Sequence, residues 1–307
     1  MRNRGVEIAP VPPVLALTVA VLAVSWAGPL VRFTEAPALV VAAWRLVLSV
    51  AFIALVLLVR GAPPPRLAVR DWLFAAASGV FLALHFWSWI ASLDLTTVSS
   101  SVVLVSTQPV FVALLSGLVL GEVATRRQWL GILVAVGGAV VIAWGDFALG
   151  RDALLGDLLA LAGAIFVSIY YVIGRRLRLL VDLWWYIGII YGMAALVLVA
   201  ATLVMPDTSL SGHGRTDWLV FLALAAGPMM LGHTLVNYAL RYVRAYVANL
   251  ALLGEPVGAT IIAWLLPTIA EVPGPQTVIG GVLILGGIGL TLTSRKVAPP
   301  AHEVATS

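Results

Sequence analysis

Ten long apolar stretches constrain this 307-residue chain more than any other feature of its sequence. They lie at about 13–31, 36–59, 72–93, 97–119, 128–145, 156–174, 183–204, 217–240, 245–267 and 276–293. Each is long enough to cross a hydrocarbon core of about 30 Å as a helix that rises about 1.5 Å per residue. Their length and their content of Ala, Leu and Gly favour helices over buried strands. Because only 10% of the residues are charged and the mean hydropathy is +1.06, we predict an all-α membrane protein with ten transmembrane helices.

The basic residues are distributed unequally between the segments that join these stretches. With both termini on one side, that side holds 14 of the 18 Lys and Arg residues, whereas the other side holds Arg32, Arg151 and Arg215. Arg45 lies within a stretch. Cytoplasmic loops are the ones enriched in Lys and Arg. We therefore expect both termini in the cytoplasm, most simply for a protein of a bacterial inner membrane.

The second half of the chain repeats short features of the first half at a nearly constant offset. The matching features are Asp71-Trp72-Leu73 with Asp217-Trp218-Leu219, Gln108-Pro109 with Glu255-Pro256, Glu122 with Glu271, and Gly131 with Gly280. The offsets lie between 146 and 149 residues, and the order is the same in both halves. Two related units are therefore expected, at 1–149 and 150–294, followed by a cytoplasmic tail at 295–307.

Each unit holds five of the predicted helices, and this odd number has a consequence for topology. The second copy enters the membrane upside down, which gives two inverted-topology repeats. Transporters are often built from such repeats, with the substrate site near the membrane midplane between the halves. The sequence therefore predicts a transporter with a central cavity that opens alternately to the two sides.

Several of these segments also resemble a known family. The segments are 91–109 with Gly121-Glu122, 239–256 with Glu271, and 35–46 in the second stretch. Together they resemble the repeated EamA-type domain of the drug/metabolite transporter superfamily, over about 280 residues. Within that superfamily the chain looks most like the YddG-type exporters of aromatic amino acids. The resemblance implies a ten-helix exporter whose central cavity is walled by helices one, three, four, six, eight and nine.

Arg45 is the one basic residue inside a predicted span. It lies eight residues after Pro37, about 12 Å into the membrane at about 1.5 Å per residue. It could hold a substrate carboxylate, but a charge at this depth more often pairs with carbonyl groups or extends to the interface. We expect the second role, with the side chain along Trp44, because the second helix is not among the cavity walls that the resemblance implies.

Histidine and aromatic side chains occupy equivalent positions in the two halves. His85 and Trp89 share a helix face, and His233 and Asn237 follow at an offset of 148 residues. These four residues are expected to line one cavity, although a membrane His is commonly satisfied by a backbone carbonyl. Trp26 and the Tyr170-Tyr171 pair also occupy nearly equivalent mid-span positions. Adjacent tyrosines point to different sides, so one of the two is expected to face the cavity.

Gln108 and Glu255 are the third pair of equivalent polar positions, each about ten residues into its span and each followed by a proline. Proline removes a backbone hydrogen bond and bends a helix. Glu255 could bind a substrate ammonium group or exchange a proton, or it could bond the backbone freed by the bend or pair with Arg45. Both interpretations stay open from the sequence.

The chain lacks the motifs of other functional classes. There is no Walker A motif, no His-Glu-x-x-His, no Gly-x-Ser-x-Gly and no cysteine, so neither an enzyme nor a cofactor or metal site is expected. The net charge of +4 gives no reason to expect a nucleic-acid partner. We expect a loosely selective exporter of aromatic and other large neutral amino acids, with export of drugs or another small metabolite as the alternative and an intramembrane enzyme as a disfavoured third. The expected substrate-binding residues are Trp26, His85, Trp89, Ser101, Gln108, Tyr170, Tyr171, His233, Asn237 and Glu255.

Overall fold

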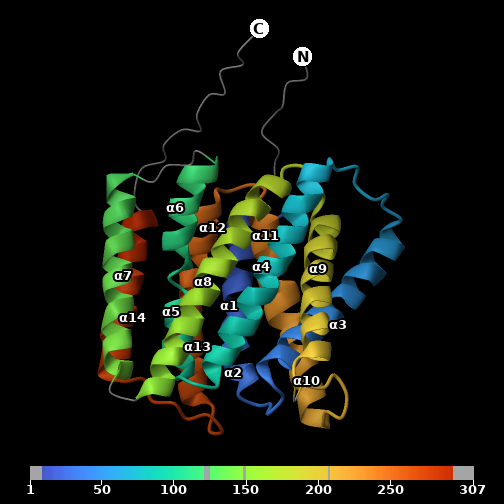
Figure 1. The fold of residues 1–307 in the computed structure, drawn as a ribbon. Helices are drawn as coiled ribbons and strands as arrows, with labels where there is room; N and C mark the ends of the chain where they lie inside the picture. The colour runs from blue at the N-terminus through green and yellow to red at the C-terminus, as the bar shows by residue number, and fades with distance from the viewer. Residues whose placement is uncertain (1–8, 121–124, 148–149, 207, 293–307) are drawn as a thin grey trace.

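The computed structural model describes residues 9–120, 125–147, 150–206 and 208–292, and over these residues all regular structure is helical (Figure 1). The helices of the first half are α1 (Pro13–Val24), α2 (Ala27–Val31), α3 (Ala38–Arg60), α4 (Val69–Leu93), α5 (Val98–Val105), α6 (Gln108–Leu120) and α7 (Arg126–Phe147). Those of the second half are α8 (Arg151–Leu177), α9 (Leu183–Val204), α10 (Arg215–Leu224), η1 (Ala225–His233), α11 (Thr234–Ala239), α12 (Ala245–Ala251), η2 (Leu252–Gly254), α13 (Glu255–Leu265) and α14 (Pro275–Leu292).

Eight helical segments in the described residues are long and apolar enough to cross a membrane. They are Pro13–Val31, Ala38–Arg60, Val69–Leu93, Val98–Val119, Arg151–Leu177, Leu183–Val204, Arg215–Ala239 and Ala245–Leu265. Each coincides with one of the ten apolar stretches, so the all-helical membrane class is confirmed. The two remaining stretches fall on α7 and α14, which are helical but are not among the eight. Glu122 and the tail at 295–307 lie outside the described residues.

Four of the spans are interrupted near their middle, and a proline lies in or next to each interruption. Ser25 and Trp26 separate α1 from α2 ahead of Pro29, and Ser106 and Thr107 separate α5 from α6 ahead of Pro109. A proline cannot donate the hydrogen bond that would continue the preceding turn. Nearby hydroxyl groups give local carbonyls a second hydrogen bond, such as Ser25 Oγ to Val21 O at 2.8 Å and Thr107 Oγ1 to Leu104 O at 2.7 Å.

The second half has interruptions of the same kind. The 3₁₀ turn η2 precedes Glu255-Pro256, and the π-helical stretch η1 contains Pro228. A π-helix accommodates extra residues per turn and often marks a functional site. The interruptions therefore place polar side chains and non-helical backbone groups in the interior of the bundle.

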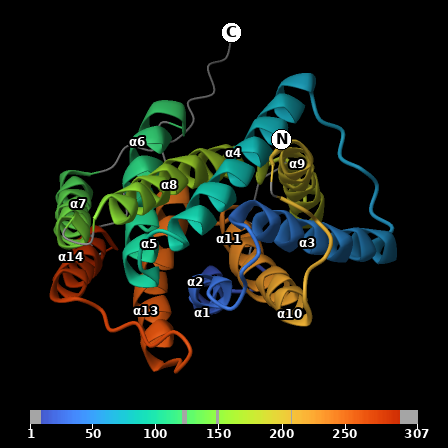
Figure 2. The same ribbon diagram turned by 60° about the horizontal axis from the view of Figure 1, so that its bottom comes forward.

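The helices of the two halves alternate around the centre of the molecule (Figure 2). Helix α4 of the first half packs along α8 and α9 of the second, and α1 packs against η1 and α11. Gly163 allows the close approach of α8 to α4, because a Cβ there would lie only 3.3 Å from Ser88 Oγ and 3.4 Å from the Cβ of Trp89. The interior is consequently lined by both halves.

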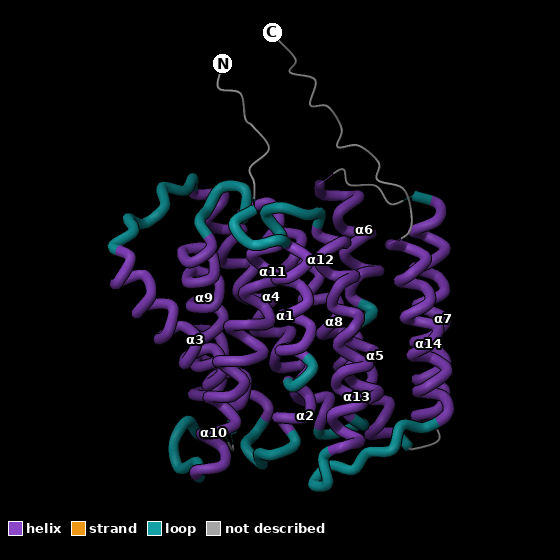
Figure 3. The backbone as a smooth tube through the Cα atoms, turned by 180° about the vertical axis from the view of Figure 1, so that it is seen from behind, coloured by secondary structure: helices purple, strands orange, loops and turns teal. Residues whose placement is uncertain are grey.

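Helices α7 and α14 lie side by side at one edge of the bundle (Figure 3). Glycines make this pairing close: a Cβ on Gly138 would come 2.5 Å from the carbonyl oxygen of Gly280, and one on Gly287 would clash with the backbone of Gly131. The glycine-rich segments therefore pack within one chain, as small residues in membrane helices commonly do.

Candidate functional site

The interior of the bundle contains a small cavity bounded by both halves of the chain. Its polar and aromatic wall residues are Arg45, His85, Trp89, Gln108, Tyr171, His233 and Glu255, and its apolar ones are Val24, Ala27, Val105 and Leu252. The cavity measures about 30 Å³, which is room for one or two water molecules and not for an organic solute. The cavity in this structure is therefore too small to hold an organic solute.

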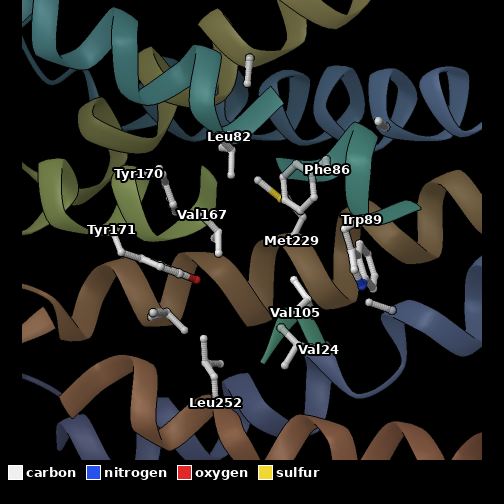
Figure 4. Packing of buried hydrophobic residues seen from close by; sticks show 14 of the residues in the cluster. Val24, Leu82, Phe86, Trp89, Val105, Val167, Tyr170, Tyr171, Met229 and Leu252 are labelled. Atoms are coloured by element: carbon white, nitrogen blue, oxygen red, sulfur yellow. The ribbon is translucent and has the colours of Figure 1, made fainter. Parts of the chain in front are cut away.

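Six of the ten expected binding residues line this cavity: His85, Trp89, Gln108, Tyr171, His233 and Glu255. They come from α4, α6, α8, η1 and α13, so segments far apart in the sequence meet here. Figure 4 shows Tyr171 and Trp89 on opposite sides of the group formed by Val24, Val105 and Leu252. The equivalent pairs His85 with His233 and Gln108 with Glu255 both have their two members on the same cavity.

The two histidines belong to a connected aromatic cluster in the cavity wall. The His85 ring stacks nearly parallel to Trp89, with centroids 6.4 Å apart, and lies 6.1 Å from the His233 ring. His85 Nδ1 lies 2.9 Å from the carbonyl oxygen of Gly163, which accepts hydrogen bonds only, so Nδ1 carries a proton. His233 Nδ1 and the Tyr171 hydroxyl are 3.2 Å apart. His85 is therefore hydrogen-bonded to a backbone carbonyl and also lines the cavity, so both roles expected for it are observed together.

Tyr170 and Asn237 belong to a different polar cluster, outside the cavity wall. Asn237 Nδ2 donates to the Tyr170 hydroxyl at 2.5 Å and to the Tyr191 hydroxyl at 3.1 Å. Both residues are fully buried, and this cluster connects α8, α9 and α11. Of the two adjacent tyrosines, Tyr171 is therefore the one that faces the cavity.

Trp26 and Ser101 also lie outside the wall of the closed cavity. Trp26 occupies the interruption between α1 and α2 with 45% of its surface exposed, and Ser101 Oγ shares a 2.6 Å hydrogen bond with Ser92 Oγ between α5 and α4. A role of Trp26, Ser101, Tyr170 or Asn237 in substrate binding stays a prediction.

Arg45 contradicts the role expected from its sequence position. It is fully buried in the cavity wall, its guanidinium lies 4.0 Å from the centroid of the Phe86 ring, and one terminal nitrogen lies 3.9 Å from Met229 Sδ. It bonds no carbonyl within the described residues, and Trp44 lies elsewhere, with its Nε1 donating to Leu210 O. The expectation is wrong because the face of α3 that carries Arg45 packs against α4 and η1 rather than against lipid. Val41 and Ser49, four positions away on either side, are buried on the same face.

Glu255 supplies the carboxylate of the cavity, at the first residue of α13. Within the described residues no ion pair joins it to Arg45, and no hydrogen bond joins its side chain to the backbone freed by the bend. Neither an ion pair with Arg45 nor a hydrogen bond to the backbone at the bend is therefore observed for Glu255 among the described residues. The cavity instead holds one carboxylate and one guanidinium at separate positions.

Polar contacts close both ends of the bundle around this cavity. At the end where α2 finishes, Arg32 donates to Thr96 O at 2.9 Å and to Glu271 Oε1 at 3.1 Å, and Glu271 Oε2 accepts from Val98 N at 2.9 Å. At the opposite end, Arg175 donates to Leu240 O at 2.6 Å. These contacts tie together helices that bound the cavity, at both ends of the bundle.

A bundle of membrane-spanning helices around a buried polar cavity is the architecture of a membrane transporter. Two segments, residues 12–144 and 154–293, match the EamA-like transporter family, and the chain belongs to that family. This confirms the resemblance to the EamA-type domain, which occurs here in two copies.

Curated relatives agree with the family, and a solved structure shares the fold. The chain is 31% identical over 216 residues to the uncharacterized transporter YdfC of Bacillus subtilis, covering 69% of this chain and 68% of that protein. It is 26% identical over 215 residues to an uncharacterized transporter of Methanothermobacter thermautotrophicus, covering 68% of this chain but only 57% of that protein. A crystal structure that is 22% identical superposes with a TM-score of 0.70 over 93% of this chain and 99% of that one, which shows a shared fold.

Proposed function

We propose that this protein exports amino acids, aromatic and other large neutral ones above all, across a bacterial inner membrane. The observation that carries the proposal is the composition of the cavity: an aromatic wall of Trp89, Tyr171 and two histidines, with one guanidinium and one carboxylate. Small-molecule sites are commonly of this kind, mostly apolar with a few convergent polar groups. A large neutral amino acid carries one carboxylate, one ammonium group and an apolar side chain, which match these three elements.

The same composition disfavours substrates with several negative charges. Sugar phosphates and nucleotide sugars bind best where several Arg or Lys side chains converge. Among the wall residues Arg45 is the one Arg or Lys side chain, and Glu255 is the one acidic side chain. A neutral zwitterion therefore matches this cavity better than a substrate with several negative charges does.

We further propose that the chain forms ten transmembrane helices in two inverted five-helix units, 1–149 and 150–294, with both termini cytoplasmic. Equivalent residues of the two halves support this arrangement, since His85 with His233 and Gln108 with Glu255 line one cavity. The interruptions support it too: α5 ends just before Gln108, and η2 ends just before Glu255. Two opposed units of similar structure can rock between states open to either side.

Flux measurements in liposomes test the proposal. Purified protein is reconstituted, and uptake of radiolabelled phenylalanine, threonine and a cationic drug is compared with uptake into protein-free vesicles. We expect protein-dependent uptake of phenylalanine that unlabelled phenylalanine inhibits. Uptake of the drug without uptake of either amino acid would favour the alternative, a drug exporter, and would refute amino-acid transport.

A further inference from the structure

Arg45 is a fully buried cation whose hydrogen-bonding groups are largely unused. Its Nε and one of its two terminal nitrogens have no hydrogen-bond partner among the described residues, and the other terminal nitrogen has only the thioether of Met229, at 3.9 Å. Thioether sulfur is a weak acceptor. The guanidinium is instead held against Phe86, 4.0 Å from the ring centroid. Its position is thus fixed by packing, while its donors stay available to the cavity.

Arg178 provides the comparison within the same protein. It is also buried, with 2% of its surface exposed, but its Nε donates to Asn237 O at 2.9 Å and a terminal nitrogen donates to Val181 O at 2.5 Å. A buried arginine that stabilises the fold has its donors satisfied by carbonyl groups in this way. Arg45 lacks such partners in the part of the chain that the structure describes, and it borders the cavity, which Arg178 does not.

A buried cation without hydrogen-bond partners is costly, so a fold that retains one needs a compensating group for it. From this we infer that Arg45 is the carboxylate-binding residue of the transport site, an assignment that rests on the proposed function and names the part of the substrate it recognises. The guanidinium presents a planar fork of N–H donors, which matches the two oxygens of a carboxylate. Nε and Nη1 have no hydrogen-bond partner among the described residues, and Nη2, which completes either bidentate edge, has only the weak thioether acceptor.

The remaining wall residues determine how the rest of the substrate lies. Glu255 is the acceptor for the ammonium group, and it borders the same cavity without an ion pair to Arg45 among the described residues. Trp89 follows Phe86 by three residues on α4, so the ring that holds Arg45 and the ring offered to the substrate side chain lie on one helix face. Because the closed cavity measures about 30 Å³, carboxylate binding takes place only after the wall opens.

Ligand-induced thermal stabilisation of the full-length purified protein tests this assignment without requiring transport. The probes form a matched series: L-phenylalanine, 3-phenylpropionate (no ammonium group) and phenethylamine (no carboxylate). A hydrogen-bonded charge pair is worth roughly tenfold or more in affinity. The wild type should therefore be stabilised half-maximally at an L-phenylalanine concentration roughly tenfold or more below that of phenethylamine, which lacks only the carboxylate.

The variants separate recognition from folding. Arg45→Met keeps an unbranched side chain but removes the guanidinium, and it should abolish the preference for L-phenylalanine over phenethylamine. Arg45→Lys keeps the charge but loses the fork and should reduce the preference; it carries the test if Arg45→Met does not fold. Arg178→Met, the control at a buried arginine outside the cavity, should lower the melting temperature and leave the preference intact.

Two results would overturn the assignment: an unchanged preference in Arg45→Met or in Arg45→Lys, or a wild type that no carboxylate stabilises. An Arg45-dependent preference in a protein that moves no labelled phenylalanine into liposomes would uphold the assignment and refute amino-acid transport instead.

Discussion

Replacing Trp89 with Leu tests whether the indole is a wall for aromatic substrates or only packing between helices. Trp89 is 3% exposed, its ring borders the cavity, and its Nε1 has no hydrogen-bond partner among the described residues, so the replacement breaks no hydrogen bond there. Leu is chosen because truncation of a buried Trp to Ala costs about 3–5 kcal/mol of stability. Stacking of an aromatic side chain on an indole is worth about 1 kcal/mol beyond apolar burial. The KM for phenylalanine should therefore rise about fivefold, while the KM for threonine should change little.

The assay is initial-rate flux of both amino acids into liposomes, with the melting temperature of each variant measured alongside. Trp87→Leu is the matched control, because Trp87 lies on the same helix, is 39% exposed and does not border the cavity. It should leave both KM values unchanged. Equal losses for phenylalanine and threonine in Trp89→Leu would show that Trp89 is packing, and the aromatic wall would then have to be formed by other residues.

Three further perturbations test separate parts of the account. Glu255→Gln removes the carboxylate of the cavity and should reduce transport and alter its pH dependence at near-normal folded yield; a change confined to thermal stability would remove Glu255 from the mechanism. Glu271→Gln weakens the contacts of Glu271 with Arg32 and Val98 N and should lower the free energy of unfolding by about 1 kcal/mol. Arg60→Gln, which removes the exposed ion pair with Asp182, should not change it measurably in the same thermal denaturation experiment. In this cysteine-free chain, Cys at Ser209 should react with an impermeant thiol reagent in intact cells and Cys at Ala62 should not; the reverse pattern would invert the proposed topology.

Much of the architecture follows from the sequence because a membrane leaves few options for the backbone. Long apolar stretches must be helical when no water is available to the backbone, so eight spans coincide with the predicted ones. Equivalent positions in a repeat come together when the repeats pack around one axis. His85 with His233, and Gln108 with Glu255, both line one cavity, whereas Asn237, the counterpart of Trp89 in the repeat, does not.

Sequence and structure disagree where the rotation of a helix about its own axis decides the outcome. Hydropathy does not tell which face of α3 turns inward, so the sequence favours carbonyl groups or the interface for Arg45, whereas the side chain lies in the cavity wall. Asn237 follows His233 by four residues in regular α-helix, but its amide donates to the hydroxyls of Tyr170 and Tyr191 and does not line the cavity.

A single cysteine at Val105 tests whether substrate crosses through this cavity as it opens to each side in turn. Val105 borders the cavity and is 6% exposed, and Val105→Cys changes its volume little. Its rate of reaction with an impermeant thiol reagent is measured in intact cells and in inside-out vesicles, with and without phenylalanine. The account predicts reaction from both sides of the membrane, slowed by phenylalanine in each case. Reaction from one side alone, or reaction that phenylalanine does not slow, would contradict it.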